Sequence, residues 1–518
     1  MENTTKREIR LFRMIVPASL ELNVFSGFIS KMTALGPVMV ATSVNKVQGW
    51  RAEVIDEGNF RGPRDSQGLP DHKALQDRNP ATAVGFYCGL SSAIPRVFHL
   101  AEFYHKSFAV TIAGGWHAHY QPTEMLENNI DVVVHGDGEY VIWQILSAVE
   151  KDGCFADIPW ISFWGAGERK TNSSETLEVR DLDDLPHPDF GLLRHAGKIK
   201  YYPIGRIRGC DRNCEFCSVK GKPRWSSPQH LFETVNWLVE TRRACRFFIV
   251  DDRLEGDLAG AIEFFKMVSE RYGRRLGFTV QVRLETAQKR ELLEAMKNAG
   301  VRVVCIGYES PIDEELKAMR KGYLSAKMLE WTRIWRSCGF RIHAMFIFGY
   351  PHPQKEISRL VNPKEDVKRF REFIRKSHVD TIQILLPVPL PGTALRERLI
   401  EEGRIFPLAI VPWDRYDGNS VCFLPKGMSR RELQEIQMKL MVRFYNLWAF
   451  ARIPFKTIAS PVDCFIWGWD RWYRHWFRDI LKAGGYLLVR RWKRGRREGD
   501  FIRQLEKYQP DEHENHGI

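Results

Sequence analysis

The sequence predicts an α/β protein with two sheets of parallel strands and a helical extension after them. This prediction rests on two series in which short apolar runs alternate with helix-like stretches, separated by a stretch rich in Gly, Ser and Pro. A chain of 518 residues is too long for one ordinary core. Its 44% hydrophobic and 27% charged residues are typical of a folded protein. We therefore expect two or three domains.

The first series, over residues 8–150, predicts a Rossmann-like domain. We expect its strands at Arg10–Val16, Arg51–Ile55, Ala83–Cys88, Ala109–Ala113 and Val132–Val134. Gly114 and Gly115 follow the fourth strand and Gly136 to Gly138 follow the fifth, at strand ends where open α/β sheets bind ligands. Because glycine in such turns is commonly structural, these positions alone identify no ligand.

The second series, over residues 199–400, predicts six strand–helix units of a partial barrel, and residues 151–198 are expected to form a linker. Ser227 is the expected N-cap of the first helix. Residues 401–518 should be a mainly helical extension with a basic tail, and the capping box at residues 429–432 opens its first helix. We expect the barrel strands at Tyr202–Ile207, Arg246–Val250, Gly277–Val282, Arg302–Ile306, Arg341–Phe348 and Thr381–Leu386.

Three cysteines, Cys210, Cys214 and Cys217, stand on a short loop just after the first barrel strand. Soft sulfur ligands select iron–sulfur clusters or zinc. A four-iron cluster held by three cysteines keeps one iron open, whereas a structural zinc site normally closes with four protein ligands. The spacing therefore favours a [4Fe-4S] cluster, and zinc with a distant fourth ligand is the alternative.

This motif, Cys-x3-Cys-x2-Cys with the aromatic Phe216 before the last cysteine, resembles that of the radical S-adenosylmethionine (radical SAM) superfamily. Gly307-Tyr308-Glu309-Ser310 after the fourth strand and residues 386–393 after the sixth are similar to further motifs of that family, and Asp251-Asp252 ends the second strand. Arg253 replaces the Asn that relatives often carry next. The resemblance implies that the three cysteines bind the cluster and that S-adenosylmethionine is contacted by Phe216, Asp252, Glu309 and Ser310.

The segments at residues 112–117 and 131–139 resemble the cobalamin-binding half of cobalamin-dependent radical enzymes. The Asp-x-His-x-x-Gly signature of proteins that ligate cobalt through histidine is missing. We expect His117, His119 and His135 to be turn or core histidines rather than ligands. The residues that this resemblance implies for cobalamin binding are Ser91, Gly114, Gly115, Gly136, Gly138 and Glu139.

The resemblance implies a cobalamin-dependent radical SAM enzyme. The cluster would cleave S-adenosylmethionine to a 5'-deoxyadenosyl radical, and the leading reaction is methylation of an unactivated carbon of a small-molecule or lipid-like substrate. The alternatives are a radical cyclisation, rearrangement or oxidation without methyl transfer, and a non-catalytic iron–sulfur or cobalamin sensor. An electron donor such as flavodoxin or ferredoxin is expected. Nucleic acid is not, because tRNA-modifying relatives carry extra cluster cysteines in the N-terminal domain, which here offers only Cys88 and Cys154.

The formal net charge is +13, and six of the eight residues from Arg490 to Arg497 are basic. Before them, residues 465–478 interleave aromatic residues with arginines, which predicts either a helix over the barrel mouth or an interfacial helix for peripheral membrane contact. No apolar stretch is long enough to span a bilayer. Arg13 interrupts the apolar run near the N-terminus, so a signal peptide fits poorly and a cytoplasmic location is expected.

Overall fold

The computed structural model describes residues 9–18, 31–151, 154–172, 181–353, 362–458, 460, 464–465, 468–495 and 498–509. By their internal contacts, the residues divide into two compact units. The first comprises residues 1–20, 26–208 and 224–248, and the second comprises residues 21–25, 209–223 and 249–518.

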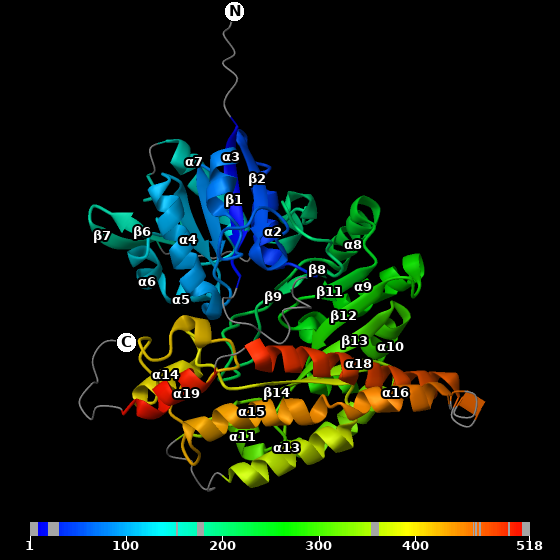
Figure 1. The fold of residues 1–518 in the computed structure, drawn as a ribbon. Coiled ribbons are helices and arrows are strands. Elements are labelled where there is room, and N and C mark those ends of the chain that lie inside the picture. The colour runs from blue at the N-terminus through cyan, green and yellow to red at the C-terminus, as the bar shows by residue number, and fades with distance from the viewer. Residues whose placement is uncertain are drawn as a thin grey trace, which may run out of the picture. The chain divides into compact units, whose positions relative to one another are not determined.

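The first unit is built on a seven-stranded sheet in the order β2-β1-β3-β4-β5-β6-β7 (Figure 1). Strands β1 to β5 run parallel, and β6 and β7 are antiparallel additions. Each of the five expected strands is observed within one residue at either end. The strands are β1 (Arg10–Val16), β2 (Trp50–Asp56), β3 (Ala83–Tyr87), β4 (Val110–Gly114), β5 (Val132–Val134), β6 (Ile161–Gly165) and β7 (Glu168–Asn172). The helices are α2 (Leu35–Val44), α3 (His72–Arg78), α4 (Ile94–Lys106), α5 (Trp116–Tyr120), α6 (Pro122–Glu127) and α7 (Gly138–Glu150).

Strand β1 is buried on both faces, as expected for the centre of a parallel sheet. Phe12 and Met14 join the apolar cluster formed with α2 and α7. On the other face, Arg13 is fully buried. Its Nε donates to Glu53 Oε1 (2.7 Å), and its Nη1 donates to the hydroxyl of Tyr104 (3.1 Å). The arginine that interrupts the apolar sequence is thus satisfied within the core.

Residues 151–198, which the sequence predicts to be a linker, contain regular structure. This stretch contains β6, which pairs antiparallel with β5, and β7, which pairs antiparallel with β6, so that both extend the first sheet. Strand β7 is polar and exposed, which makes it hard to distinguish from a polar loop in sequence. Ser173 and Ser174, part of the same expected linker, lie outside the described residues.

The other parallel strands form a six-stranded sheet in the order β15-β14-β13-β12-β11-β8, the partial barrel that the sequence predicts. The first strand ends at Ile204, three residues earlier than expected, and the fourth continues to Glu309. The strands are β8 (Tyr202–Ile204), β11 (Arg246–Ile249), β12 (Gly277–Val282), β13 (Val301–Glu309), β14 (Arg341–Ile347) and β15 (Thr381–Leu385), and a separate antiparallel pair is formed by β9 (Ile207–Arg208) and β10 (Arg224–Trp225). The helices are α8 (Pro228–Arg242), α9 (Leu258–Tyr272), α10 (Arg290–Asn298), α11 (Asp313–Ala318), α12 (Met328–Ser337), α13 (Pro363–Ser377) and α14 (Ala394–Glu401).

The expected helix caps are present. The Ser227 hydroxyl accepts from the backbone N–H of His230 (3.1 Å) at the start of α8. The Ser429 hydroxyl accepts from the N–H of Glu432 (3.1 Å) and so caps the first helix of the C-terminal extension. This extension consists of α15 (Arg430–Phe444), α16 (Trp448–Ile458), α18 (Trp469–Gly495) and α19 (Glu498–Lys507).

Helix α15 covers the edge strand of the barrel sheet, β15. The hydroxyl of Tyr445, just after α15, accepts from the N–H of Ile382 (2.9 Å) and donates to its carbonyl (2.7 Å). The side-chain amide of Gln437 donates to the carbonyl of Ile384 (2.8 Å). These side chains satisfy backbone groups that an exposed edge would offer to another chain.

Helix α18 does not lie over the barrel mouth. Its Phe477 ring contacts the guanidinium of Arg341, 4.0 Å from the ring centroid, and its Arg474 donates to the carbonyl of Arg336 (2.8 Å). Arg341 begins β14, so α18 packs at the amino ends of the strands, opposite the ends where barrel sites form. Among the described residues, none of the helices combines the length and the apolar character needed to cross a membrane.

Candidate functional site

The cysteine loop is held by backbone groups and by polar side chains on either side of it. The N–H of Gly209 donates to Asp252 Oδ2 (2.7 Å), and Asp252 stands just after β11. Lys220 Nζ donates to the carbonyl of Cys214 (2.8 Å). Asp252, which the resemblance assigns to S-adenosylmethionine, therefore fixes the start of the loop.

Glu215, between two of the cysteines, anchors the middle of the loop and is a residue that sequence reasoning missed. Its carboxylate accepts from Arg398 Nε (2.8 Å) and Nη2 (3.0 Å) and from the hydroxyl of Tyr350 (2.7 Å). Its backbone N–H donates to the carbonyl of Met319 (3.0 Å). Bidentate arginine–carboxylate pairing of this kind fixes orientation as well as contributing energy. Phe216 follows, with its ring edge-on to that of Tyr350 (centroids 6.4 Å apart).

The three thiols are close enough to influence one another. Burial raises the pKa of the Cys217 thiol, and neighbouring Cys214 and Cys210 raise it further. A cationic cluster offsets this mutual repulsion, because soft metals bind cysteine as the thiolate. In the described part of the chain, no three His, Cys, Asp or Glu side chains are grouped as ligands of a single metal ion. The donor set of three thiolates fits a [4Fe-4S] cluster with one open iron.

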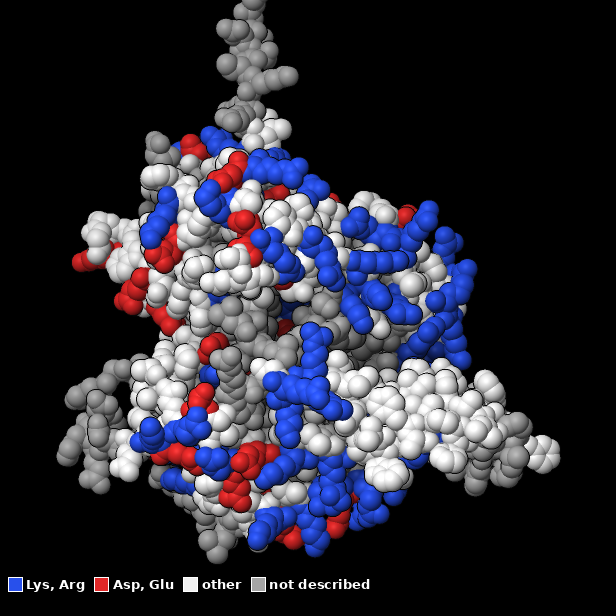
Figure 2. Space-filling view, viewed as in Figure 1, with Lys and Arg blue, Asp and Glu red and all other residues white. Residues whose placement is uncertain are grey.

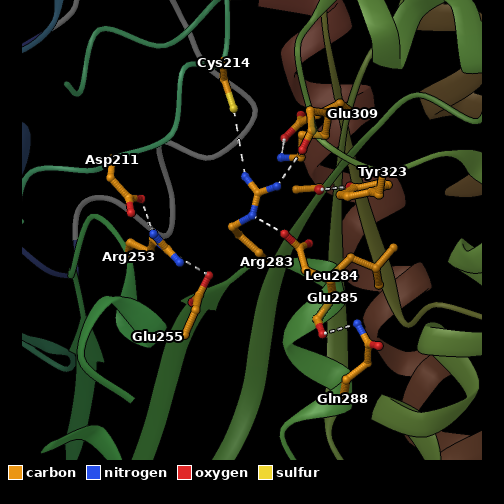
Figure 3. A network of polar contacts seen from close by, with 12 residues as sticks. Asp211, Cys214, Arg253, Glu255, Arg283, Leu284, Glu285, Gln288, Glu309 and Tyr323 are labelled. Atoms are coloured by element: carbon orange, nitrogen blue, oxygen red, sulfur yellow. Dashed lines mark hydrogen bonds and ion pairs between the residues drawn. The ribbon is translucent and has the colours of Figure 1, made fainter. Parts of the chain in front are cut away.

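Arg283 points at the cysteine loop from the carboxyl end of β12 (Figure 3). Its Nη1 lies 3.9 Å from the sulfur of Cys214, its Nη2 donates to the carbonyl of Lys321 (2.6 Å), and its Nε donates to Glu285. Burial works against the charged guanidinium, but Glu285 and Cys214 outweigh it and raise the pKa of Arg283. A permanent positive charge thus stands beside the Cys214 sulfur. In the sequence, Arg283 could have been identified from its position directly after a barrel strand, as Asp252 and Glu309 were.

Glu309 is turned toward the site by an irregularity in β13. The register between β13 and β14 shifts between Gly307 and Glu309, and Glu309 has φ +59°, a left-handed value that is uncommon outside glycine. Its Oε1 accepts from Lys321 Nζ (2.6 Å), and both side chains are buried. Lys321 is therefore a further site residue that sequence reasoning missed. Strained backbone of this kind is common at functional sites.

Ser310 does not face the same site as Glu309. Its hydroxyl donates to Glu315 of α11 and accepts from the N–H of Ile312 (3.0 Å), and the residue is fully buried. The structure thus gives Ser310 a turn-forming role at the start of α11. Arg253, whose place in the motif departs from the family, pairs with Asp211 and lies 3.5 Å from Glu255 Oε1, so it too contacts the cysteine loop (Figure 3).

In the first unit, the residues that resemble a cobalamin site lie at the carboxyl ends of β3, β4 and β5. Gly136 has open space around it, since no heavy atom of the described residues, apart from its chain neighbours, lies within 4 Å of a Cβ built there. Ser91 is buried, and its hydroxyl lies 2.9 Å from Nδ1 of His117. His117 is a core histidine, as expected.

Glu139 is engaged by the β9–β10 pair. Its Oε1 accepts from Arg208 Nη2 (2.7 Å), while Asp137 is 3.0 Å from Arg208 and 2.7 Å from Arg224. Burial opposes ionisation of Asp137, but the two arginines outweigh it and hold its pKa below the ordinary value. The acidic residues of this loop therefore bind the strands that flank the cysteine loop in sequence.

His119 and His135 form a pair in the same region, with their Nδ1 atoms 3.3 Å apart, and His135 Nε2 lies 2.7 Å from the hydroxyl of Ser162. Burial, and after it the neighbouring His119, lower the pKa of His135 to about 4. His135 is therefore neutral at pH 7, so both imidazoles are held by neutral hydrogen bonds.

We expect the native state to lose stability as the pH falls from about 6.5 to about 4. Unfolded His135 binds a proton near pH 6.5, whereas the folded residue does so only near pH 4. Between these two pH values the unfolded state binds more protons than the native state, so acidification favours unfolding. Urea unfolding midpoints at pH 7 and pH 5 should fall more in the wild type than in His135→Gln. Identical pH dependence in the two proteins would show that His135 is not buried as a neutral base.

The chain is similar in sequence to several known proteins. Residues 204–363 match the model of the Radical SAM superfamily. An uncharacterized methyltransferase of Pyrococcus horikoshii is 24% identical over 64% of this chain and 72% of its own length. An anaerobic magnesium-protoporphyrin IX monomethyl ester cyclase of Cereibacter sphaeroides is 24% identical over 67% of this chain and 57% of its own length. The hopanoid C-2 methylase of Rhodopseudomonas palustris is 28% identical over 44% of each chain.

Two solved structures share the architecture over most of the chain. The radical S-adenosylmethionine methyltransferase TsrM of Kitasatospora setae, with cobalamin and a [4Fe-4S] cluster bound, matches with a TM-score of 0.66 and 16% identity over 83% of this chain and 89% of its own. The cobalamin-dependent radical enzyme OxsB matches with a TM-score of 0.64 and 16% identity over 96% of this chain and 79% of its own. Residues 204–363 therefore form a radical SAM domain, and the chain has the fold of the cobalamin-dependent radical SAM enzymes.

Proposed function

We propose that this chain is a cobalamin-dependent radical SAM enzyme that methylates an unactivated carbon of a small-molecule or lipid-like substrate. The observation that carries the proposal is the combination, in one chain, of a three-cysteine loop next to barrel strand ends and a Rossmann-like sheet with an open glycine turn after β5. The methyltransferases and the methylase among the relatives support methyl transfer.

Cys210, Cys214 and Cys217 would hold the cluster, and Glu215 and Asp252 would keep their loop in place. A bound cluster and cobalamin supply the electron that cleaves S-adenosylmethionine and the site that carries a methyl group, which side-chain acid–base chemistry cannot provide. Arg283 offers a guanidinium beside Cys214, suited to a carboxylate such as that of the methionine moiety. Glu309, oriented by Lys321, presents a carboxylate that can accept hydrogen bonds from ribose hydroxyls.

In the first unit, we propose that the glycine turns after β4 and β5 admit the nucleotide tail of cobalamin. Gly136 supplies the open space, and Gly114 has only Val134 near its Cβ position, at 3.9 Å. Ser91 and Glu139 keep the structural roles described above, with Glu139 acting through its pair with Arg208 rather than as a direct ligand. Gly138 begins α7, and a Cβ there would lie 3.0 Å from a methyl group of Val40.

The alternative is a radical cyclisation, rearrangement or oxidation that uses cobalamin without methyl transfer. The cyclase among the relatives favours this alternative, because it matches as large a share of the chain as the methyltransferase does. A non-catalytic sensor is disfavoured, because such a protein has no need of Glu309 and Arg283 at the strand ends.

Methyl transfer and the alternative are separated by the products of S-adenosylmethionine. We expect the reconstituted chain, given reductant and S-adenosylmethionine, to release S-adenosylhomocysteine only when cobalamin is added. Chromatography with mass detection quantifies both S-adenosylhomocysteine and 5'-deoxyadenosine. Deoxyadenosine without any S-adenosylhomocysteine at saturating cobalamin would assign the chain to the cyclisation or rearrangement class.

Two partners belong to the same proposal. A flavodoxin or ferredoxin would supply electrons, and a lipid-like substrate would require peripheral membrane contact of a cytoplasmic enzyme. Two of the aromatic residues expected to make that contact pack within the protein instead, since Trp472 is buried and Phe477 packs on Arg341. Any membrane contact must therefore use the exposed side chains of the C-terminal helices and not Trp472 or Phe477.

A further inference from the structure

Helices α16 and α18 form an antiparallel hairpin that is closed by its own polar contacts. Asp479 of α18 is buried and lies 3.1 Å from Arg452 and 2.5 Å from Lys456, both on α16. The indole N–H of Trp472 donates to the carbonyl of Lys456 (3.0 Å), and that of Trp476 donates to the hydroxyl of Thr457 (2.9 Å). The hairpin therefore satisfies its inner face without help from another molecule.

The opposite face of the hairpin exposes large apolar side chains. Phe455 is 73% exposed and Ile458 79%, at the end of α16, and Phe465 is 93% exposed in the connection between the helices. Trp448 lies seven residues before Phe455, on the same side of α16, and is 74% exposed. Figure 2 shows this region as an uncharged surface over α16 and α18 of Figure 1. Contiguous apolar surface of this kind on a folded protein marks an interaction site.

The net charge of the hairpin is positive. Residues 447–495 contain ten Lys and Arg and three Asp and Glu, a difference of +7, and one of the three acids is the buried Asp479. The basic residues at the end of α18 are exposed, namely Arg490, Arg491, Lys493 and Arg494. Figure 2 shows Lys and Arg beside the uncharged surface. A second copy of this chain would bring a surface of the same sign and be repelled, whereas an anionic surface is attracted.

We propose that the exposed face of the α16–α18 hairpin, lined by Trp448, Phe455, Ile458, Phe465 and Trp469, docks on an anionic lipid bilayer. Apolar and aromatic side chains enter the boundary between headgroups and acyl chains, and the basic end of α18 pairs with lipid phosphates. Indole rings suit this boundary, since one edge is apolar and the N–H can reach water. The proposal deepens the peripheral membrane contact of the proposed function, but its evidence is the surface of the hairpin and not the reaction.

The test is flotation of the full-length chain with phosphatidylcholine vesicles and with vesicles that also contain phosphatidylglycerol. The test variant is Phe455→Ser/Ile458→Ser, whose side chains are exposed and make no core contact. The matched control is Phe108→Ser/Trp143→Ser, which removes exposed apolar side chains, 96% and 51% exposed, from the first unit. Circular dichroism spectra and thermal unfolding midpoints that match the wild type should establish that both variants fold.

We expect the wild type and the control to float with phosphatidylglycerol-containing vesicles at low salt, and the bound fraction of the test variant to fall by about tenfold or more, because two apolar side chains no longer leave water. A wild type that stays unbound with both kinds of vesicle would overturn the proposal. So would equal binding of the test variant and the wild type. Light scattering that shows a wild-type dimer, lost in the test variant, would assign the surface to a second copy instead.

Discussion

Replacing Cys217 with alanine is expected to remove the iron–sulfur cluster and, with it, all reductive cleavage of S-adenosylmethionine. The loop supplies three thiolates for four irons, so no ligand is left in reserve when one is lost. Iron and sulfide analysis after anaerobic reconstitution measures the loss directly, and the yield of 5'-deoxyadenosine from S-adenosylmethionine and dithionite measures its consequence. Both should drop to background.

Cys245→Ala is the matched control, because Cys245 is an exposed cysteine outside the loop. It should keep the iron, sulfide and deoxyadenosine of the wild type. Full iron and sulfide in Cys217→Ala would show that other side chains hold the cluster.

Gly136→Val should abolish retention of cobalamin while the cluster stays intact. A side chain built at Gly136 enters open space, so it displaces no protein atom and fills the volume proposed for the cofactor. Gly115 is less suitable, since its φ is +118° and a Cβ there would lie 2.8 Å from the backbone of Cys88 and Gly89. Valine at Gly115 would therefore disturb the fold itself.

The matched control for this variant is Gly36→Val, since Gly36 also has no heavy atom within 4 Å of a built Cβ. After incubation with hydroxocobalamin and gel filtration, the wild type and Gly36→Val should carry cobalamin and Gly136→Val should not. Equal cobalamin in all three proteins would place the cofactor elsewhere, and none in the wild type would remove cobalamin from the proposed function.

The strands of both sheets could be predicted because buried parallel strands carry a strong apolar signal. Strand β12 matches its expected bounds, Gly277–Val282, and β1 and β5 match theirs. Strands β6 and β7 were missed, because β7 is largely polar and exposed and lies at the sheet edge. An edge strand of this kind has no period-two apolar pattern to detect.

The ligand residues were easier to predict than the residues that position them. The cysteine spacing identifies the loop, but nothing adjacent in sequence indicates that Glu215 meets Arg398, 183 residues away. Likewise, Glu309 was found from its motif, whereas its partner Lys321 required the fold. The motif position of Ser310 does not show that its hydroxyl turns back to Glu315, and its contact with S-adenosylmethionine stays a prediction.

For the C-terminal helices too, the sequence predicts the element but not its packing. Interleaved aromatic and basic residues in α18 indicated an amphipathic helix, but not which neighbour would cover its aromatic side. Phe477 packs on Arg341 and Trp472 packs on α16, so the exposed apolar surface comes largely from α16 and from Phe465. Tertiary packing decides which of two apolar surfaces remains accessible.

The most direct test of radical SAM chemistry in this chain is the formation of 5'-deoxyadenosine by the wild type. Anaerobically reconstituted protein is incubated with S-adenosylmethionine and dithionite, and the nucleoside is quantified by mass spectrometry alongside iron, sulfide and zinc. We predict about four iron and about four sulfide per chain, and deoxyadenosine that accumulates with time. Stoichiometric zinc in place of iron, with no deoxyadenosine, would contradict the assignment.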